Sequence, residues 1–442
     1  MNKARAEQVQ EDKWSGRKRT TLLITLFTVS VFSQIDRVLP FILAESIKRD
    51  LGLSDTQIGL LTGVAFSVCY SLASVPLGRI SDKGWAKQVL LFCILVWSLM
   101  TTLGGLATGF VLLALSRFGV ALGEAGGTPA SHAIIVDKIP TKFRGRAIGL
   151  FSMGIPLGTM IGFALGGFIG DSFGWRYTFI GAGMLGLIAV LLVLLFTKKN
   201  TVVRDAGQGS KNLITSALDL FSKPAFVWLF VVANLVGFAT APFYSFTAPF
   251  LIRTHNFTAS EVGLSFGLLQ GLMGIFGTLM GGRWFDKIVD SGNKKLMGPP
   301  AVALIVSSVA LLLGLFMPTG MLTILCFVPG MFSFAFLLPF AFGSGHLVAG
   351  QGKQALATGI FMMGSGILSV ALSPLLVGII SDMATMASIG NGLQIGMLIV
   401  PLFCALAGVG CLMASNSIKK FHGKAKGTSG AGQGFTEKFN ES

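Results

Sequence analysis

Long runs of apolar residues, separated by short polar segments, dominate the chain. An α-helix of about 20 apolar residues is long enough to cross a bilayer. Twelve runs reach this length, and we expect each to form one membrane-spanning helix. They lie at residues 20–44, 55–77, 88–108, 110–136, 143–171, 174–196, 224–253, 258–283, 295–316, 320–349, 353–383 and 388–415. The pattern predicts an all-α membrane protein.

The longest polar interruption divides these runs into two sets of six. It covers residues 197–223 and contains Gly, Ser and Lys. We therefore expect a cytoplasmic N-terminal tail, two six-helix bundles joined by a cytoplasmic linker, and a disordered cytoplasmic C-terminal tail. Their boundaries are 1–19, 20–196, 197–223, 224–415 and 416–442.

Two internal repeats support the division into related halves. The segment Gly78–Lys83 after the second run returns as Gly282–Lys287 after the eighth. At a similar offset, Gly167 and Asp171 of the fifth run match Gly378 and Asp382 of the eleventh. Duplicated bundles around a site near the midplane of the membrane are typical of secondary transporters.

The composition agrees with a lipid environment. Hydrophobic residues make up 52% of the chain and charged residues 12%, whereas soluble proteins carry about 25% charged residues. The first nineteen residues are polar, and the apolar run that follows is too long for a signal peptide, so we expect the first helix to remain in the membrane.

The formal net charge of +15 does not indicate nucleic-acid binding, because of where the basic residues lie. Nearly all of the 34 Lys and Arg residues lie in segments on one side of the predicted helices. Under the positive-inside rule this side is cytoplasmic. We expect a multi-pass inner-membrane protein, monomeric, with both termini in the cytoplasm. The exceptions are Lys48, Arg49, Arg176, Arg253 and two arginines inside the membrane, Arg37 and Arg117.

No residue pattern indicates catalysis or a cofactor. The chain has no H-E-x-x-H, G-x-S-x-G or Walker A sequence. All five cysteines lie inside apolar runs without the spacing of metal ligands. We therefore expect a transporter rather than an enzyme, without a metal or cofactor.

The segment Gly78–Lys87 resembles the signature loop of the major facilitator superfamily, G-x-x-x-D-[RK]-x-G-x-[RK]. A breakable contact of an acidic residue with a neighbouring helix end suits a cytoplasmic gate. The alternative is a solvated loop that only sets orientation, but its repetition favours the gate. The gating candidates are Gly78, Asp82, Lys83, Arg283 and Asp286.

The fifth run is similar to a second motif of this superfamily, G-x-x-x-G-P-x-x-G-G. It carries Gly158, Gly162 and Gly166-Gly167, but has Phe163 where the motif has proline. Because close helix packing alone explains such glycines, we infer only packing and hinge behaviour from them.

A narrower resemblance links the first half to the spinster family of lipid-related facilitators. It rests on Asp36-Arg37, on Arg117 with Gly123-Glu124-Ala125, and on the segments Arg144–Ala147 and Ile155–Gly158. In the second half only general superfamily features appear. The resemblance implies transport of a lysophospholipid or a sphingoid phosphate.

Four ionisable residues lie inside the predicted membrane helices of the first half, where charge is costly and usually functional. Asp36, Arg37 and Arg117 share a depth about two turns from the outer ends of their helices, and Glu124 lies seven residues beyond Arg117. We expect Asp36 and Glu124 to carry protons, with Arg117 as their exchangeable partner. The resemblance implies the same roles.

Two alternatives stay open for these charges. Arg37, adjacent to Asp36, points to another face and either binds an anionic head group or braces the helices. A buried ion-pair network that only fixes helix register would also explain Glu124.

The second half has aromatic residues where the first has charges, including Phe243 and Phe336. Packing or lipid contact explains any single ring, but together the rings suggest an apolar wall opposite a charged one. We expect Arg37, Arg117, Phe243 and Phe336 to bind an amphiphilic, lipid-like anion in proton-coupled transport. The alternative is a proton-coupled facilitator of a small organic anion, such as a carboxylate or a sugar phosphate, clamped by the two arginines.

Overall fold

The computed structural model describes residues 16–197, 213–291, 295–350 and 353–428. These residues form helices joined by short connections, and none of them lies in a β-strand. The chain forms two compact units, one of residues 1–210 with 256–268 and one of residues 211–255 with 269–442.

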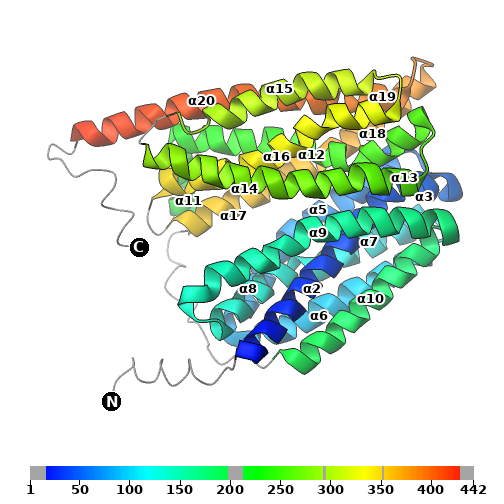
Figure 1. The fold of residues 1–442 in the computed structure, drawn as a ribbon, viewed down its shortest axis with the longest axis horizontal. Coiled ribbons are helices and arrows are strands. Elements are labelled where there is room, and N and C mark those ends of the chain that lie inside the picture. The colour runs from blue at the N-terminus through cyan, green and yellow to red at the C-terminus, as the bar shows by residue number, and fades with distance from the viewer. Residues whose placement is uncertain (1–15, 198–212, 292–294, 351–352, 429–442) are drawn as a thin grey trace. The chain divides into compact units, whose positions relative to one another are not determined.

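The first unit holds six membrane-length helical segments and the start of an eighth. Its elements are α2 (Gly16–Ile42), α3 (Ala44–Leu51), α4 (Asp55–Gly59), η1 (Leu60–Val64), α5 (Ala65–Ile80), η2 (Ser81–Trp85), α6 (Ala86–Gly105), α7 (Phe110–Ala125), α8 (Gly127–Lys138), α9 (Thr141–Phe173), α10 (Trp175–Phe196), α13 (Ala259–Val262) and η5 (Gly263–Gly267). Within it, α2 packs against α9 and α10, and α6 packs against α7 and α10 (Figure 1).

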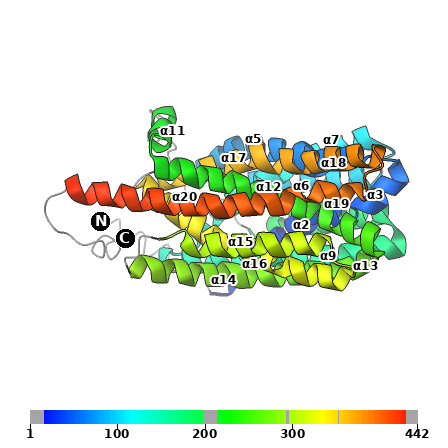
Figure 2. The same ribbon diagram turned by 90° about the horizontal axis from the view of Figure 1, so that it is seen from above.

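The second unit holds the remaining helices. They are α11 (Leu213–Phe221), α12 (Pro224–His255), α14 (Leu268–Asp290), α15 (Gly298–Leu315), α16 (Gly320–Ala349), α17 (Gln354–Gly364), η6 (Ser365–Val370), α18 (Leu372–Met386), α19 (Gly392–Met397) and α20 (Ile399–Thr428). Here α20 packs against α12 and α15, and Figure 2 shows the short α11 turned across the direction of α12.

Eleven stretches of the described residues are long and apolar enough to cross a membrane. One of them, Asp55–Gly105, has 51 residues and would be about 75 Å long as a straight helix, more than twice the thickness of the hydrocarbon core. Gly84 interrupts it with a φ of 93°, a conformation that glycine adopts without a steric penalty. The stretch therefore supplies two spans, and the expectation of twelve membrane helices is confirmed.

Three expected boundaries differ from the structure. Helix α2 begins at Gly16, so the N-terminal tail is shorter than 1–19, and residues 1–15 lie outside the described part. The expected linker 197–223 contains α11, while its residues 198–212 are not described. Helix α20 continues to Thr428, so the region expected to be disordered from 416 is helical as far as the structure describes it.

The two halves repeat the start of one helix in detail. Ser54 and Gln57 form a capping box at the start of α4, in which each side chain bonds the other residue's backbone N–H. Thr258 and Glu261 form the same capping box at the start of α13. In both copies a π-helical turn follows, η1 in the first and η5 in the second. The duplication seen in the sequence thus includes helix caps and local helix geometry.

Candidate functional site

The four intramembrane charges of the first unit lie on two helices. Asp36 and Arg37 lie on α2, and Arg117 and Glu124 lie on α7. Asp36, Arg117 and Glu124 are 2–3% exposed. Because an isolated buried charge is very costly, the partners of these side chains determine what the cluster can do.

Glu124 is held by Arg37. The Nε and Nη2 atoms of Arg37 both donate to Oε2 of Glu124, at 2.9 and 2.7 Å. The other carboxylate oxygen, Oε1, is buried without a hydrogen-bond partner among the described residues. The side chain of Glu124 is fully buried, whereas that of Arg37 is 32% exposed. The ion pair therefore has one buried member and one member that reaches accessible space.

Gly123 allows α7 to approach α6 beside this pair. A Cβ atom at this position would lie 2.6 Å from the backbone N of Trp97 and 2.8 Å from the carbonyl O of Cys93. Real Cβ atoms do not approach backbone this closely, so only glycine fits here. The close packing of α7 on α6 fixes the position of the next residue, Glu124.

Asp36 has a different partner from its neighbour Arg37. Its Oδ2 accepts a hydrogen bond of 2.5 Å from the hydroxyl of Thr101 on α6. Its Oδ1 is buried without a partner among the described residues. Consecutive residues of a helix point about 100° apart, so one carboxylate and one guanidinium from α2 reach two different helices.

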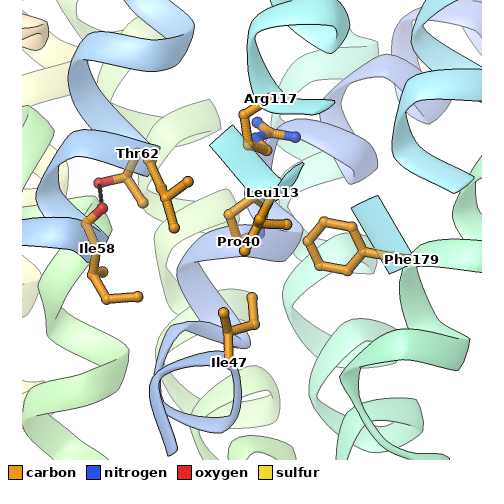
Figure 3. A pocket seen from close by; sticks show the side chains of 8 residues that line it. Pro40, Ile47, Ile58, Thr62, Leu113, Arg117 and Phe179 are labelled. Carbon is orange, nitrogen blue, oxygen red and sulfur yellow. Dashed lines mark hydrogen bonds between the residues drawn. The ribbon is translucent and has the colours of Figure 1, made fainter. Parts of the chain in front are cut away.

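Two of the three guanidinium nitrogens of Arg117 form no hydrogen bond with the described residues. Its Nε and Nη1 atoms are buried and have no partner. The residue lines a small hollow whose other walls are mostly apolar. Figure 3 shows Arg117 at one end of this hollow, with Leu113, Pro40 and Phe179 beyond it.

The hydrogen-bonded ion pair of Glu124 is formed with Arg37 rather than with Arg117, and the role of Arg117 as an exchangeable partner of the carboxylates stays a prediction. Arg117 and Glu124 are seven residues apart on α7, which separates their backbones by about 10 Å along the helix. Arg37 reaches Glu124 from α2 instead. Sequence position placed Arg37 on another face from Asp36, but it could not identify which carboxylate that face meets.

Two aromatic residues of α5 complete the cluster. The guanidinium carbon of Arg37 lies 5.0 Å from the ring centre of Phe66 and 4.8 Å from that of Tyr70. Arg117 lies 5.3 Å from the same ring of Phe66. Phe66, Tyr70 and Thr101 were not predicted from the sequence, because uncharged residues of these types are common in membrane helices.

The aromatic candidates of the second unit are packed inside it. Phe243 is fully buried, with its ring edge-on to Phe327 and Phe334. Phe336 is 4% exposed and lies against Phe332, Phe340 and Trp284. In this structure neither ring faces an open cavity, so their expected place in a substrate site gains no support from the geometry.

The four charged gating candidates are exposed, and Gly78 is half-buried. Asp82 and Lys83 lie in η2 just before the turn at Gly84, and within the described residues neither forms an ion pair. Arg283 and Asp286 lie on α14, which continues to Asp290 because the second copy has no glycine at the position of the turn. Gly78 lies near Pro129, 3.5 Å from the position a Cβ atom would take. The gating role expected from this motif stays a prediction.

Comparisons with known proteins assign the chain to a family. The model described as Major Facilitator Superfamily matches residues 22–374. A relative from Mycolicibacterium smegmatis (strain ATCC 700084 / mc(2)155), an "MFS-type efflux pump", is 31% identical over 381 residues, 85% of this chain and 87% of its own. A "Probable L-galactonate transporter" of Escherichia coli (strain K12) is 28% identical over 302 residues, 64% of this chain and 65% of its own.

Among solved structures, a bacterial homologue of the human lysosomal transporter Spinster superposes with a TM-score of 0.82. It is 25% identical to this chain, and the alignment covers 92% of this chain and 99% of that one. The resemblance to the spinster family, drawn from residues of the first half, is thus confirmed across the fold. The chain is a transporter rather than an enzyme, and it belongs to the major facilitator superfamily.

Proposed function

We propose that this protein couples proton movement to the transport of an amphiphilic, lipid-like anion by alternating access. The observation that carries the proposal is the ion pair formed by Glu124 and Arg37, together with Arg117, whose Nε and Nη1 atoms have no hydrogen-bond partner among the described residues. A buried carboxylate and two arginines, only one of which forms an ion pair with it, can exchange partners when a proton arrives.

The chemistry follows from charge balance. When Glu124 takes up a proton, the ion pair becomes a neutral acid beside a free cation, and Arg37 loses its counter-ion. Arg37 is the partly exposed member of the pair, so its guanidinium is available to an anion. Arg117 offers a second cation with two free donors. Planar guanidinium groups suit the oxygens of a carboxylate or a phosphate. In this scheme protonation of Glu124 and anion binding favour each other.

Asp36 serves as a second proton site in this scheme. It is buried, and its only hydrogen bond among the described residues comes from the hydroxyl of Thr101. The two carboxylates therefore have different hydrogen-bond partners, a guanidinium for Glu124 and a hydroxyl for Asp36. Such a difference allows them to bind protons at different stages of the cycle.

Two observations favour different substrates. The superposition with a Spinster homologue supports an amphiphilic lipid such as a lysophospholipid or a sphingoid phosphate. The L-galactonate transporter among the relatives favours the alternative, a small organic anion. The efflux pump among the relatives supports outward transport.

Orientation and gating belong to the same proposal. The bias of Lys and Arg toward one side supports an inner-membrane location with both termini in the cytoplasm. The exposed Asp82 and Lys83, with Arg283 and Asp286, act as a gate in conformations that pair them.

The coupling is tested in proteoliposomes with the variant Glu124→Gln. We expect it to abolish accumulation driven by a pH gradient while exchange of substrate across the membrane continues. The matched control is Glu45→Gln, which makes the same chemical change at a carboxylate paired with Arg49 outside the cluster. Full accumulation by the Glu124 variant under a pH gradient would exclude this carboxylate as the coupling group.

The substrate is tested by competition with lysophospholipids of eight to eighteen carbons and with galactonate. Burial of each CH₂ group contributes about 0.8 kcal/mol, so a lipid site predicts affinity that rises up to about fourfold per carbon until the site is full. A flat series together with strong competition by galactonate would favour the small-anion alternative.

A further inference from the structure

Both arginines of the cluster lie against one aromatic ring. Phe66 is on the first turn of α5, and its ring centre lies 5.0 Å from the guanidinium carbon of Arg37 and 5.3 Å from that of Arg117. Tyr70, one turn further along α5, stacks on Phe66 with ring centres 5.7 Å apart and also contacts Arg37. Two cations that repel each other are thus held beside the same ring, which is only 9% exposed.

An aromatic face attracts a cation, and the attraction is stronger where water is excluded. Arg117 has two buried nitrogens without hydrogen-bond partners, so the ring of Phe66 adds a favourable contact to the attraction of Arg117 to the nearby carboxylates of Asp36 and Glu124. For Arg37 the ring orients a long side chain toward Glu124. The other titratable or charged groups facing these arginines are Asp36 and the phenol of Tyr70.

The local helix geometry places Phe66 where its ring can contact both arginines. The π-helical turn η1 ends two residues before it, and a π turn rotates all following residues about the helix axis. The second half repeats this turn as η5, but it has Gln270 and Gly274 at the positions that correspond to Phe66 and Tyr70. The turn is duplicated and the aromatic pair is not. The aromatic pair and the intramembrane charges therefore occur together, in the first half only.

We propose that Phe66, supported by Tyr70, is a positioning residue that holds Arg37 and Arg117 for exchange between the carboxylates and the transported anion. This inference rests on the proposed proton-coupled function. It adds that the ring, through its electrostatics as well as its shape, keeps the second arginine inside the cluster while the first is paired. Loss of the ring's negative face should loosen both arginines.

The test replaces Phe66 in the full-length protein with phenylalanine carrying one, two and three ring fluorines. Fluorination weakens the negative face of the ring, changes its size little and makes it more apolar. A positioning role predicts that the thermal unfolding midpoint falls step by step, by about 2–8 °C in total. A packing role predicts a constant or rising midpoint. The control is the same series at Phe163, a fully buried ring that contacts Phe266 and, among the residues that the structure describes, no cation.

The second readout is the infrared band of protonated buried carboxyl groups, followed against pH. The band is assigned by its loss in the variants Asp36→Asn and Glu124→Gln. We expect its midpoint to rise with each fluorine, by roughly 0.5–1.5 pH units in total, because loosened guanidinium groups stabilise the carboxylates less. We expect Phe66→Tyr to retain the parent midpoint and Phe66→Leu to exceed it.

The two readouts separate failure of this inference from failure of the proposed function. If the carboxyl band does not titrate but the unfolding midpoint falls stepwise, proton coupling is wrong and the positioning role stands. If the unfolding midpoint does not fall with fluorination, the positioning role is wrong, whatever the carboxyl groups do.

Discussion

Replacement of Gly123 by alanine should disturb the candidate site without changing any of its charged residues. The added methyl group would lie 2.6 Å from the backbone N of Trp97 and 2.8 Å from the carbonyl O of Cys93. Both atoms belong to the backbone of α6, so neither can rotate away. Helix α7 must move outward, and Glu124, the next residue, must move with it.

Gly119 provides a matched control on the same helix. A methyl group there would meet Cγ and Sδ of Met100, both at 2.5 Å, and this flexible side chain can take another rotamer. Both substitutions gain about 1 kcal/mol of helix propensity, so this term cancels in the comparison. Overpacking against rigid atoms costs about 1–3 kcal/mol. We expect Gly123→Ala to be less stable than Gly119→Ala by that amount.

Thermal unfolding of the purified protein measures this difference. At about 2–4 °C per kcal/mol for a domain of this size, the two midpoints should differ by about 2–12 °C. Transport driven by a pH gradient should fall in Gly123→Ala and persist in Gly119→Ala. Equal midpoints and equal transport in the two variants would refute the argument that contact between α6 and α7 positions the carboxylate.

Three further predictions concern hydrogen bonds of the first unit. A hydrogen bond from Arg176 holds the pKa of Asp50 below its ordinary value. The ionised Asp50 therefore stabilises the fold above about pH 4, and this stabilisation is lost as the pH falls further. The thermal unfolding midpoints of the parent and of Asp50→Asn should converge as the pH is lowered below that value. Asp171 accepts two hydrogen bonds, of 2.7 and 2.6 Å, from the start of α13, so Asp171→Asn should speed amide hydrogen exchange in α13 and η5 about 3–10-fold. Thr101→Val should weaken proton-driven transport about tenfold by removing the hydrogen bond to Asp36, and Thr101→Ser should restore it; equal transport by both variants would contradict this role.

Most of the fold could be predicted from the sequence, because the membrane imposes a simple rule on length and polarity. A stretch that is apolar over about 20 residues must satisfy its backbone internally, and a helix does so. The turn at Gly84 was also predictable, since the motif around Asp82 requires a reversal between two spans. The helix that continues to Thr428 was not predicted, because polar residues such as Lys419 and Lys420 are compatible with a helix that leaves the membrane as well as with a disordered tail.

The charged residues of the site could be predicted from the sequence, but the pairs that they form could not. Charges inside apolar runs identify Asp36, Arg37, Arg117 and Glu124 without any structure, since lipid makes each of them costly. Which arginine meets Glu124 depends on side-chain direction and on the distance between α2 and α7, and neither is encoded in residue spacing. Residues that interact through a ring face or a single hydroxyl, such as Phe66, carry no signal that separates them from packing residues.

The asymmetry between the halves argues that the duplicated features support the helices and the unduplicated ones perform the chemistry. Both halves keep a capping box followed by a π-helical turn. Only the first has carboxylates and guanidiniums in its membrane interior; α16 contains no Asp, Glu, Lys or Arg, and α12 has only Arg253 near its end. The second bundle therefore holds its helices together without such charges. Stability alone therefore does not explain the cluster around Glu124. Apolar residues packed at the same positions would avoid the desolvation cost of its four charges, and the second unit, with Phe243 and Phe336 packed among other rings, has that apolar interior.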